Sequence, residues 1–414
     1  MSAVMDKILN ETGRAVASYL DACVHCGNCA EACHFYEVTR DTKYVPALKF
    51  DPLLKAYKRH KAPFSGLRRA LGIAPAEVTD TEVAQWQELL YDSCTMCGRC
   101  TMVCPMGIDI ASIVGMCRKS MADAGMAPKE LIEIARRSKE EGSPLGVTPQ
   151  VLKDRLEWIA DDNEVEIPLD KPKAQVLLTM SSIEIMKYPA DVAAVAKILN
   201  HAGIDWTMSS KGYEATNFGY LSGDREITKI MTSRIVDAAE SIGAKTVIVP
   251  ECGHAYGVMR WQAGNIVGRE LPFEVLHISE FLERMRLDGQ LKLKPLTKTV
   301  TFHDPCQIVR RGGAGSAPRN VLASFATDFR EMDPTADQNW CCGGGGGVTT
   351  LSSAKHLQYK VFEIKKRQVA QTGATAMVSS CSNCRLVIDE DIEHVGWDKE
   401  NLSLVDLVAE HLEG

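Results

Sequence analysis

The sequence has no run of about 18 or more apolar residues, so no segment is predicted to cross a membrane as a helix. It also lacks a basic excess, because 54 acidic residues outnumber 47 lysines and arginines and leave a net charge of −7. Nucleic-acid binding requires cationic side chains that neutralise phosphates, and this charge balance argues against it. The N-terminal stretch MSAVMDKILNETGRAVASYLDAC lacks the uninterrupted apolar core of a secretory signal. We therefore expect a cytoplasmic protein.

What the sequence has in excess is cysteine. The chain of 414 residues, 45% of them hydrophobic, is long enough for two or three domains with a large core. It carries 15 cysteines, and a reducing compartment disfavours disulfides between them. All but Cys117 and Cys252 fall in three groups along the chain, and Cys117 lies on the apolar face of a predicted helix. Thiols grouped in this way usually bind metal.

Two cysteine runs in the first third of the chain share one spacing. CVHCGNCAEAC and CTMCGRCTMVCP both read C-x2-C-x2-C-x3-C. This spacing holds [4Fe–4S] clusters in bacterial two-cluster ferredoxins, where the fourth cysteine of each run serves the other cluster. Zinc is the alternative, but zinc prefers paired C-x2-C units that close a tetrahedron. We therefore predict two cubanes, one held by Cys23, Cys26, Cys29 and Cys104, and the other by Cys94, Cys97, Cys100 and Cys33.

About sixty residues separate the two runs, which is too many for a minimal bacterial ferredoxin. The intervening stretch contains helical patterns such as DTEVAQWQELLYDSC. It resembles the all-helical ferredoxin module of respiratory iron–sulfur subunits. We therefore predict that residues 1–145 form a helical ferredoxin module with two [4Fe–4S] clusters.

A stretch rich in proline and glycine follows, and we predict a linker over residues 146–172. Beyond it, short apolar strands alternate with helical patterns, which is typical of α/β units. The clearest strands are AQVLLTM, VIVP, FEVLHI, TVTF and AMVSS.

This α/β region is predicted to contain two copies of one layout, over residues 173–297 and 298–414. VLLTMSSIEI parallels VTFHDPCQIV, and VPECGHA parallels SSCSNCR once a gap is allowed. Cys252 of the first copy then matches Cys381 of the second, and the other four cysteines of the second copy have no counterpart. The predicted fold class is therefore α plus α/β, with two pseudo-symmetric repeats of which the first is degenerate.

The second copy keeps five cysteines in the pattern C-x34-C-C-x38-C-x2-C, namely Cys306, Cys341, Cys342, Cys381 and Cys384. This pattern resembles the cysteine-rich CCG domain of the heterodisulfide reductase family. The order of the domains is similar to HdrD of the methanogen enzyme and to the DsrK subunit of sulfur-metabolising microbes, with FHDPC, CCGGGGG and PECGHAY as the stretches most like DsrK. The resemblance covers essentially the whole chain. It implies that the five cysteines hold a third, catalytic four-iron cluster, either cubane or non-cubane.

The glycine run after Cys342 fits that implication. Glycines let the backbone approach sulfides closely and leave room for a substrate sulfur. A phosphate loop is excluded, because no G-x-x-x-x-G-K-[ST] motif is present. A flexible linker is the remaining alternative, although Thr349, Thr350 and Ser352 offer helix caps that favour an ordered loop.

Two residues of the degenerate copy are further catalytic candidates. We hypothesise that Cys252, with a lowered thiol pKa, points across the pseudo-twofold interface at the third cluster, and that His254 is a proton donor or ligand. The alternative is a vestigial cysteine and a structural histidine. His303 and Asp304, just before Cys306, could also orient the site or could simply bind backbone.

The segment KFDPLLKAYKRHKAPFSGLRR, residues 49–69, carries seven lysines and arginines against one aspartate. Such a run is usually a solvated face. The resemblance implies docking on a membrane cytochrome b subunit, and a basic amphipathic segment at the membrane surface fits that partner.

The resemblance also implies a function. The chain would be a cytoplasmic redox subunit, membrane-associated through partner subunits, that makes or breaks a disulfide or trisulfide. Its partner would be a DsrC-like thiol protein or a small heterodisulfide, and the two cubanes would exchange electrons with a cytochrome b and the quinone pool. Two alternatives stay open: an electron conduit in a Tmc- or Hmc-type complex, and the iron–sulfur subunit of a lactate, glycolate or glycerol-3-phosphate dehydrogenase.

Overall fold

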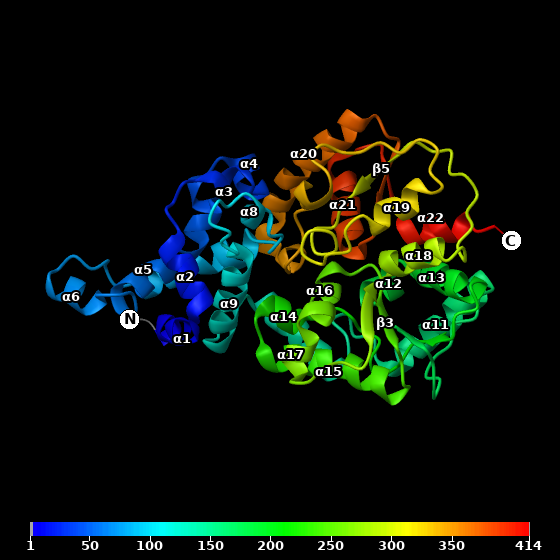
Figure 1. Cartoon of the computed structure of the whole chain (residues 1–414), viewed down its shortest axis with the longest axis horizontal. Helices are drawn as coiled ribbons and strands as arrows, with labels where there is room; N and C mark the ends of the chain where they lie inside the picture. Colours follow the sequence, from blue (N-terminus) through cyan, green and yellow to red (C-terminus); the bar gives the residue numbers. More distant parts are fainter. Residues whose placement is uncertain (1–2, 414) are drawn as a thin grey trace. The chain divides into compact units, whose positions relative to one another are not determined.

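The structure is a computed structural model that describes residues 3–413, and it divides into two compact units (Figure 1). Each unit is built from three segments of the chain. Unit 1 comprises Met1–Ile132, Leu221–Arg225 and Gly343–Glu363, and unit 2 comprises Glu133–Tyr220, Glu226–Cys342 and Ile364–Gly414. The glycine run therefore belongs to unit 1, whereas the five cysteines of the CCG pattern belong to unit 2.

Unit 1 is helical, and its described residues contain no strand. Its first segment holds α1 (Ala3–Glu11), α2 (Arg14–Ala22), α3 (Asn28–Glu31), α4 (His34–Thr39), η1 (Thr42–Tyr44), η2 (Pro46–Phe50), α5 (Asp51–His60), α6 (Ser65–Ala70), α7 (Asp80–Gln87), η3 (Glu88–Asp92), α8 (Arg99–Met102) and α9 (Ile110–Asp123). The later segments add η5 (Val348–Thr350) and η6 (Ser352–Ala354).

Helix α9 is central to unit 1, because it packs against α1, η2, η3 and α8. Its first turn is capped by Asp109, whose carboxylate accepts a hydrogen bond from the Ser112 N–H at 3.1 Å. Its buried face includes Ile113, Val114 and Cys117. Cys117 therefore lies in the core, as its apolar helix face predicts.

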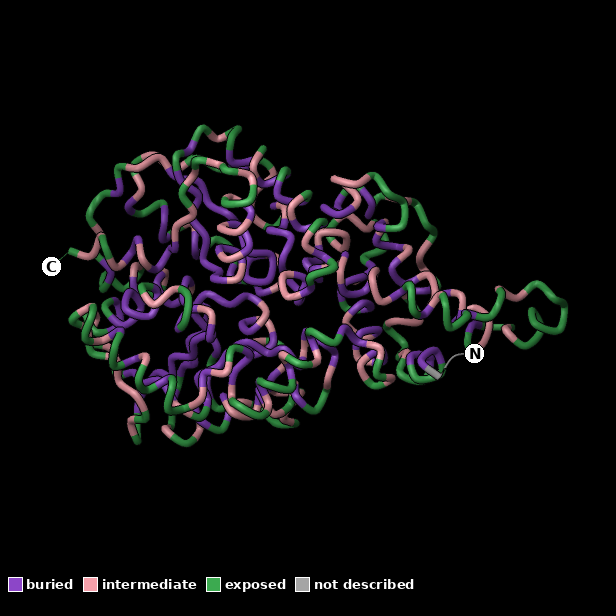
Figure 2. The backbone as a smooth tube through the Cα atoms, turned by 180° about the vertical axis from the view of Figure 1, so that it is seen from behind, coloured by how far each residue is buried: buried purple, intermediate pink, exposed green. Residues whose placement is uncertain are grey.

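Unit 2 contains two parallel sheets (Figure 1). The first has the order β2-β1-β3-β4, with β1 (Val176–Leu178), β2 (Trp206–Thr207), β3 (Thr246–Val249) and β4 (Glu274–His277). The second has the order β5-β6-β7, with β5 (Val300–His303), β6 (Ala376–Ser379) and β7 (Glu400–Ser403). Strands β1, β3, β5 and β6 are buried at every residue, in keeping with the buried interior in Figure 2. Burial on both faces is typical of parallel sheets covered by helices.

Helices surround both sheets. They are α11 (Pro149–Asn163), α12 (Ser182–Lys187), α13 (Pro189–His201), α16 (Gly253–Trp261), α17 (Ala263–Val267), α18 (Ile278–Leu287), α19 (Ala317–Ala323), η4 (Ala336–Gln338), α21 (Ser382–Val395) and α22 (Leu404–Glu410). Four more cross the boundary between the units: α10 (Lys129–Glu141), α14 (Phe218–Ser222), α15 (Arg225–Ser241) and α20 (Lys355–Thr372). Helix α11 occupies most of the predicted linker.

One apolar core serves both sheets of unit 2. It includes Leu178 and Ile248 from the first sheet and Val300, Phe302 and Val378 from the second. Helices α13 and α22 pack against each other in this core. The predicted combination of a helical N-terminal region and a parallel α/β region is confirmed. Over residues 3–413, no helix is both long and apolar enough to cross a membrane.

The parallel strands set the position of the cysteines. The carboxyl ends of parallel strands lie at one edge of their sheet. Strand β5 ends at His303, which pairs in register with Ser379 at the end of β6. Cys306 follows β5, and Cys381 follows β6. The second sheet therefore brings cysteines that lie far apart in the sequence to one edge.

Candidate metal centres

The first cavity in unit 1 is lined by four cysteines from two distant stretches, Cys23, Cys26, Cys29 and Cys104. Its other walls are largely apolar and include Ala47, Phe50, Ile108 and Ile110. Burial raises the pKa of the Cys29 thiol, while a hydrogen bond from the Ala47 backbone acts in the opposite direction.

A second cavity in unit 1 is lined by Cys33, Cys94, Cys97 and Cys100, together with His34, Phe35, Pro46 and Lys49. The ammonium of Lys49 is buried and donates to the carbonyl of Ser93. Burial raises the pKa of Cys33, and the positive charge of Lys49 acts against that rise. A buried cation beside four thiols favours their anionic, metal-binding form.

The two cysteine runs have the same backbone conformation. His25 and Met96, each just before the second cysteine of its run, have φ of 52° and 53°. Gly27 and Gly98, just after that cysteine, have φ of 85° and 75°. The helices α3 and α8 that follow contact each other. Two cavities with four thiols each fit the ligand set of two four-iron cubanes.

The third group of cysteines lies in unit 2. The thiols of Cys306, Cys341, Cys342, Cys381 and Cys384 are all buried and none forms a disulfide. The sulfurs of Cys306 and Cys341 are 3.8 Å apart. The sulfurs of Cys342 and Cys384 lie within 4.8 Å of each other and of a ring nitrogen of His303. Buried thiols converging without a disulfide fit an iron–sulfur cluster.

Helix α21 begins inside this group, because Cys381 is its N-cap residue and Cys384 lies in its first turn. A hydrogen bond from Cys384 and main-chain N–H groups, including that of Gly253, lower the pKa of Cys381 to about 7. The pKa of Cys384 is raised, chiefly by its hydrogen bonds with Cys342 and Cys381. The hydrogen bond from Cys384 and the main-chain N–H groups therefore favour the anionic form of Cys381.

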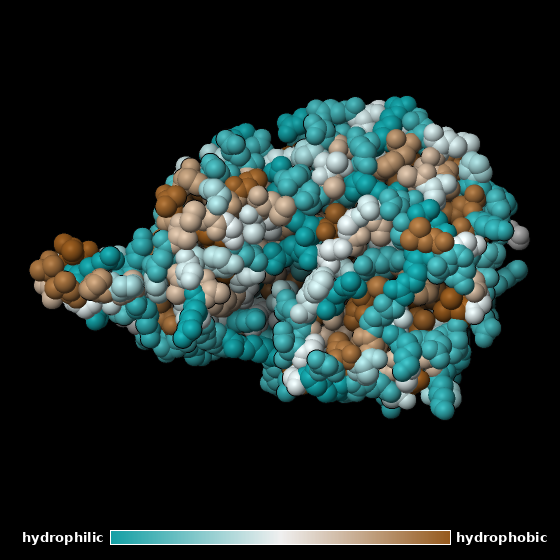
Figure 3. All heavy atoms as spheres, in the orientation of Figure 1, coloured by the Kyte–Doolittle hydropathy of each residue, from teal (hydrophilic) through white to brown (hydrophobic). Residues whose placement is uncertain are grey.

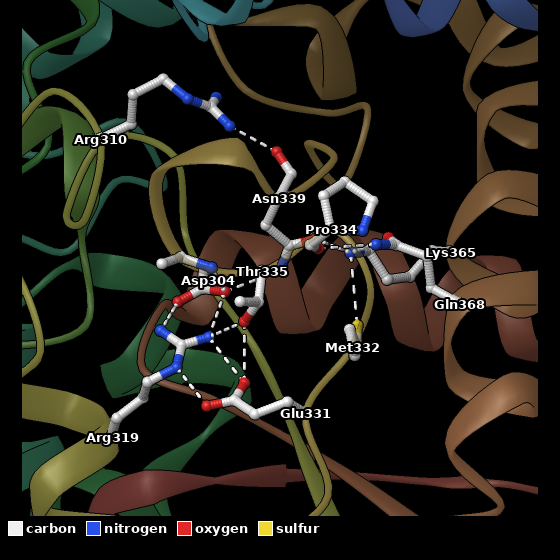
Figure 4. A network of polar contacts seen from close by, with 11 residues as sticks. Asp304, Arg310, Arg319, Glu331, Met332, Pro334, Thr335, Asn339, Lys365 and Gln368 are labelled. Atoms are coloured by element: carbon white, nitrogen blue, oxygen red, sulfur yellow. Dashed lines mark hydrogen bonds and ion pairs between the residues drawn. The ribbon is translucent and has the colours of Figure 1, made fainter.

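The paired cysteines Cys341 and Cys342 are positioned by a polar network that sequence reasoning missed (Figure 4). Asn339, two residues earlier, accepts a hydrogen bond at Oδ1 from Lys365 Nζ at 2.9 Å. Its Nδ2 donates to Asp304 at 2.9 Å, and Asp304 is held by Arg319 at 2.7 Å. The structure thus places Asp304 in a side-chain network that fixes the segment before Cys341.

Lys365 of α20 is the unexpected member of this network, because it is fully enclosed. Burial lowers its pKa to about 8, against the opposing effect of Asp304 and of Cys342, Cys341 and Cys384. Gln368, one turn further along α20, accepts a second hydrogen bond from Nζ at 2.7 Å. The sequence offered only a weak signal, a lysine and a glutamine three residues apart in a charged helix.

The segment around Cys252 contacts the five-cysteine group. A Cβ on Gly253 would lie 2.8 Å from the Cβ of Gln307, so only glycine fits there. The Ser382 N–H and hydroxyl donate to the carbonyl of Glu251 at 2.6 and 3.0 Å.

Cys252 itself is buried, and its sulfur lies 3.9 Å from Thr216 Oγ1. Burial raises the pKa of Cys252, and the negative charge of Cys381 adds to that rise. The expected lowering of this pKa is therefore wrong, because the loss of water on burial disfavours the thiolate. His254, in the first turn of α16, follows on the same segment.

The glycine run is ordered and closely packed within unit 1. Gly343, Gly346 and Gly347 have φ of 96°, 65° and 86°. A Cβ on Gly346 would lie 2.9 Å from the carbonyl carbon of Thr95, and one on Gly347 would lie 2.8 Å from Leu131. These contacts exclude larger residues and rule out a flexible linker.

Comparisons with known proteins match the regions of the chain that contain these cysteines. Residues 19–108 match a family described as a 4Fe-4S dicluster domain, and residues 300–389 match a family described as a cysteine-rich domain, CCG. The HdrD subunit of the dihydromethanophenazine:CoB–CoM heterodisulfide reductase of Methanosarcina barkeri is 28% identical over 95% of this chain and 94% of that protein. An Hdr-like menaquinol oxidoreductase iron–sulfur subunit of Archaeoglobus fulgidus is 26% identical over 80% of this chain and 68% of its own length.

Two further matches complete the comparison. The EtfAB:quinone oxidoreductase of Syntrophomonas wolfei is 27% identical over 90% of this chain, which spans 55% of that protein. A hypothetical protein from Helicobacter pylori has a similar fold, with a TM-score of 0.50 and 9% identity over 99% of this chain and 77% of its own. The predicted dicluster module and cysteine-rich domain are therefore confirmed, and both indicate iron–sulfur clusters.

Proposed function

We propose, from the premise that this chain is an HdrD-like iron–sulfur protein, that it makes or breaks a sulfur–sulfur bond at the five-cysteine group. It would act as a cytoplasmic subunit of a membrane-linked complex. The observation that carries the proposal is the convergence of five buried thiols in unit 2, none of them in a disulfide. The substrate would be a DsrC-like thiol protein, as disulfide or trisulfide, or a small heterodisulfide.

Three four-iron clusters would serve this chemistry. Two cubanes would be held by the cysteines that line the two cavities of unit 1. The third would be held by Cys306, Cys341, Cys342, Cys381 and Cys384. A cluster bound there would supply one-electron redox chemistry and iron that binds a thiolate sulfur. The two cubanes would relay electrons between this site and a quinone-linked cytochrome b, a role consistent with the quinone and menaquinol partners named for the relatives.

The protein's own groups would handle charge and protons. Reduction of a disulfide consumes two electrons and two protons and releases two thiols. The ammonium of Lys365 is buried beside the paired cysteines and would offset negative charge that develops on sulfur. Cys252 keeps its proton because of its raised pKa. We therefore assign it as a hydrogen-bond donor to the second sulfur, with His254 beside it.

The two α/β copies would form a pseudo-twofold pair, of which only the second binds a cluster. Cys252 precedes α16 as Cys381 precedes α21, and each residue is the N-cap of its helix. The segment that carries Cys252 also contacts Gln307 and Ser382 beside the five-cysteine group. This placement supports a role for the degenerate copy as one wall of the substrate site.

Docking would use residues 64–73, which overlap the end of the basic segment, contain α6 and are called the α6 tip below. Phe64 and Leu67 there are 75% and 57% exposed, and the brown residues at the end of α6 in Figure 3 mark this apolar surface. Arg68 and Arg69 are exposed beside them. Exposed apolar and cationic side chains together favour an anionic membrane surface. We propose that the α6 tip binds the membrane next to the cytochrome b partner.

A second function is favoured by the match to the EtfAB:quinone oxidoreductase. In that case the chain would pass electrons from a flavoprotein to quinone without acting on a disulfide.

An anaerobic assay with a viologen donor separates the two functions, because it supplies electrons without the flavoprotein. The proposal expects thiol release from a heterodisulfide or from a DsrC-like trisulfide. Its loss in Cys381→Ser and its slowing in Cys252→Ala would support the assigned site, whereas no thiol release from either substrate would favour the conduit.

A further inference from the structure

His303 is the last residue of β5 and lies at the edge of the sheet where the cysteines gather. Its side chain is completely buried. Among the described residues, neither Nδ1 nor Nε2 has a hydrogen-bond partner. One ring nitrogen lies within 4.8 Å of the sulfurs of both Cys342 and Cys384. The ring is therefore a polar group without a partner, aimed into the proposed cluster site.

A buried imidazole without a partner is unfavourable in a folded protein, so its retention calls for a ligand. A neutral imidazole carries a lone pair that binds a metal.

The same strand face offers partners for the second ring nitrogen. Thr301 lies two residues before His303 on β5, and residues two apart in a strand point to the same face. Ser379 of β6 is the register partner of His303. Among the described residues, the hydroxyls of Thr301 and Ser379 also lack hydrogen-bond partners. Metal-binding histidines usually donate their other N–H to such a neighbour.

We propose that His303 binds iron at the five-cysteine group through a ring nitrogen, which gives the third cluster a mixed cysteine and histidine ligand set. This inference rests on the proposed function, because it requires a cluster at that site. A neutral imidazole adds no negative charge to the cluster, whereas a thiolate at the same position would, so the histidine keeps the reduction potential higher than a cysteine there. His303 would then set the potential at which the site exchanges electrons with a sulfur substrate.

Pulsed EPR on anaerobically purified protein tests the inference directly. The whole chain is produced with histidine enriched in the heavy nitrogen isotope, and the nitrogen coupling to the paramagnetic third cluster is recorded. His201 provides the control, because it is an exposed histidine at the end of α13. We expect the coupling of a directly bound nitrogen in the wild type and in His201→Ala, and its loss in His303→Ala.

A second variant guards against misfolding. His303→Cys keeps a ligand atom at the position, and it should retain the third cluster, lack the nitrogen coupling and have a lower reduction potential. A wild-type cluster without strong nitrogen coupling, or a coupling that persists in His303→Ala or His303→Cys, would overturn the inference and leave the proposed function intact. Wild-type protein with only about eight irons would lack the third cluster and would overturn both.

Discussion

The guanidinium of Arg118 donates a hydrogen bond from Nη2 to the main-chain carbonyl of Cys94 at 2.8 Å. Arg118 lies on α9 and is completely buried. It also donates to the carbonyls of Leu90 at 2.9 Å, Leu221 at 3.0 Å and Gly346 at 2.6 Å. One cation thus ties the loop of the second cysteine run to the glycine run within unit 1.

We predict that Arg118→Gln lowers the reduction potential of the cubane at Cys94, because a buried positive charge stabilises the reduced, more negative cluster. Loss of hydrogen bonds from a charged donor should also reduce the free energy of unfolding by about 3 kcal/mol. EPR-monitored potentiometry and thermal unfolding measure the two effects. Arg136→Gln, on an exposed side chain that pairs with Glu140, is the control. An unchanged potential in Arg118→Gln would show that the arginine acts only on stability.

Iron content tests the ligand assignments in unit 1. The wild type should bind about twelve irons, as expected for three four-iron clusters. Cys97→Ser removes a thiol that lines the second cavity and should lower the content to about eight. Cys117→Ser changes a buried thiol outside the cavities and should keep the wild-type content. Equal losses in both variants, or tightly bound zinc in place of iron, would contradict the assignment.

A buried acidic cluster in unit 2 predicts an unusual pH dependence. Burial raises the pKa of Asp191, Glu251 and Asp406 to about 8, although Arg385 opposes the rise. Glu184, whose pKa burial also raises, lies in the same cluster. The folded state therefore keeps protons that the unfolded state releases near pH 4. The resulting stability is fully present below about pH 4 and is lost as the pH rises through about 8.

Asp191→Asn tests this linkage, because the amide cannot release a proton. Thermal unfolding between about pH 5 and 9 should show the wild-type midpoint falling as the pH rises. The fall should be shallower in Asp191→Asn than in the wild type or in Asp154→Asn, an exposed change on α11. Parallel curves for all three proteins would contradict the linkage.

The α6 tip should determine how much of the protein is recovered with membrane vesicles. Lys55 and Arg59 of the basic segment form ion pairs with Glu82 and Glu77, so reversing their charge would also break these contacts. Arg68→Glu with Leu67→Ser changes only exposed side chains and should reduce recovery with anionic vesicles. The difference from the wild type should be largest at low ionic strength, because salt screens exposed charges. Lys153→Glu is the exposed control. If the α6 variant is recovered with vesicles as fully as the wild type, the segment is an ordinary solvated face and not a membrane-binding surface.

The spacing of the cysteines along the sequence is enough to predict their three groups, because the ligands of iron–sulfur clusters recur at fixed intervals. The positions of His303 and Lys365 depend on the register of β5 with β6 and on the packing of α20, which no local pattern encodes. The sequence predicts a lowered pKa for Cys252, but burial by segments distant in the sequence raises it. The predicted linker contains α11 because Thr148 caps it and Pro149 occupies its first turn, where proline is tolerated.

The most direct test of the central claim is a single-turnover measurement of thiol release. Reduced, anaerobic protein is mixed with a heterodisulfide or a DsrC-like trisulfide, and thiols and cluster oxidation are followed together. The account predicts two thiols for every two electrons from a heterodisulfide in the wild type and in Cys117→Ser. It predicts no release in Cys342→Ser, whose two unit 1 clusters remain reducible. Release at the wild-type rate from Cys342→Ser would contradict the claim that the five-cysteine group performs the chemistry.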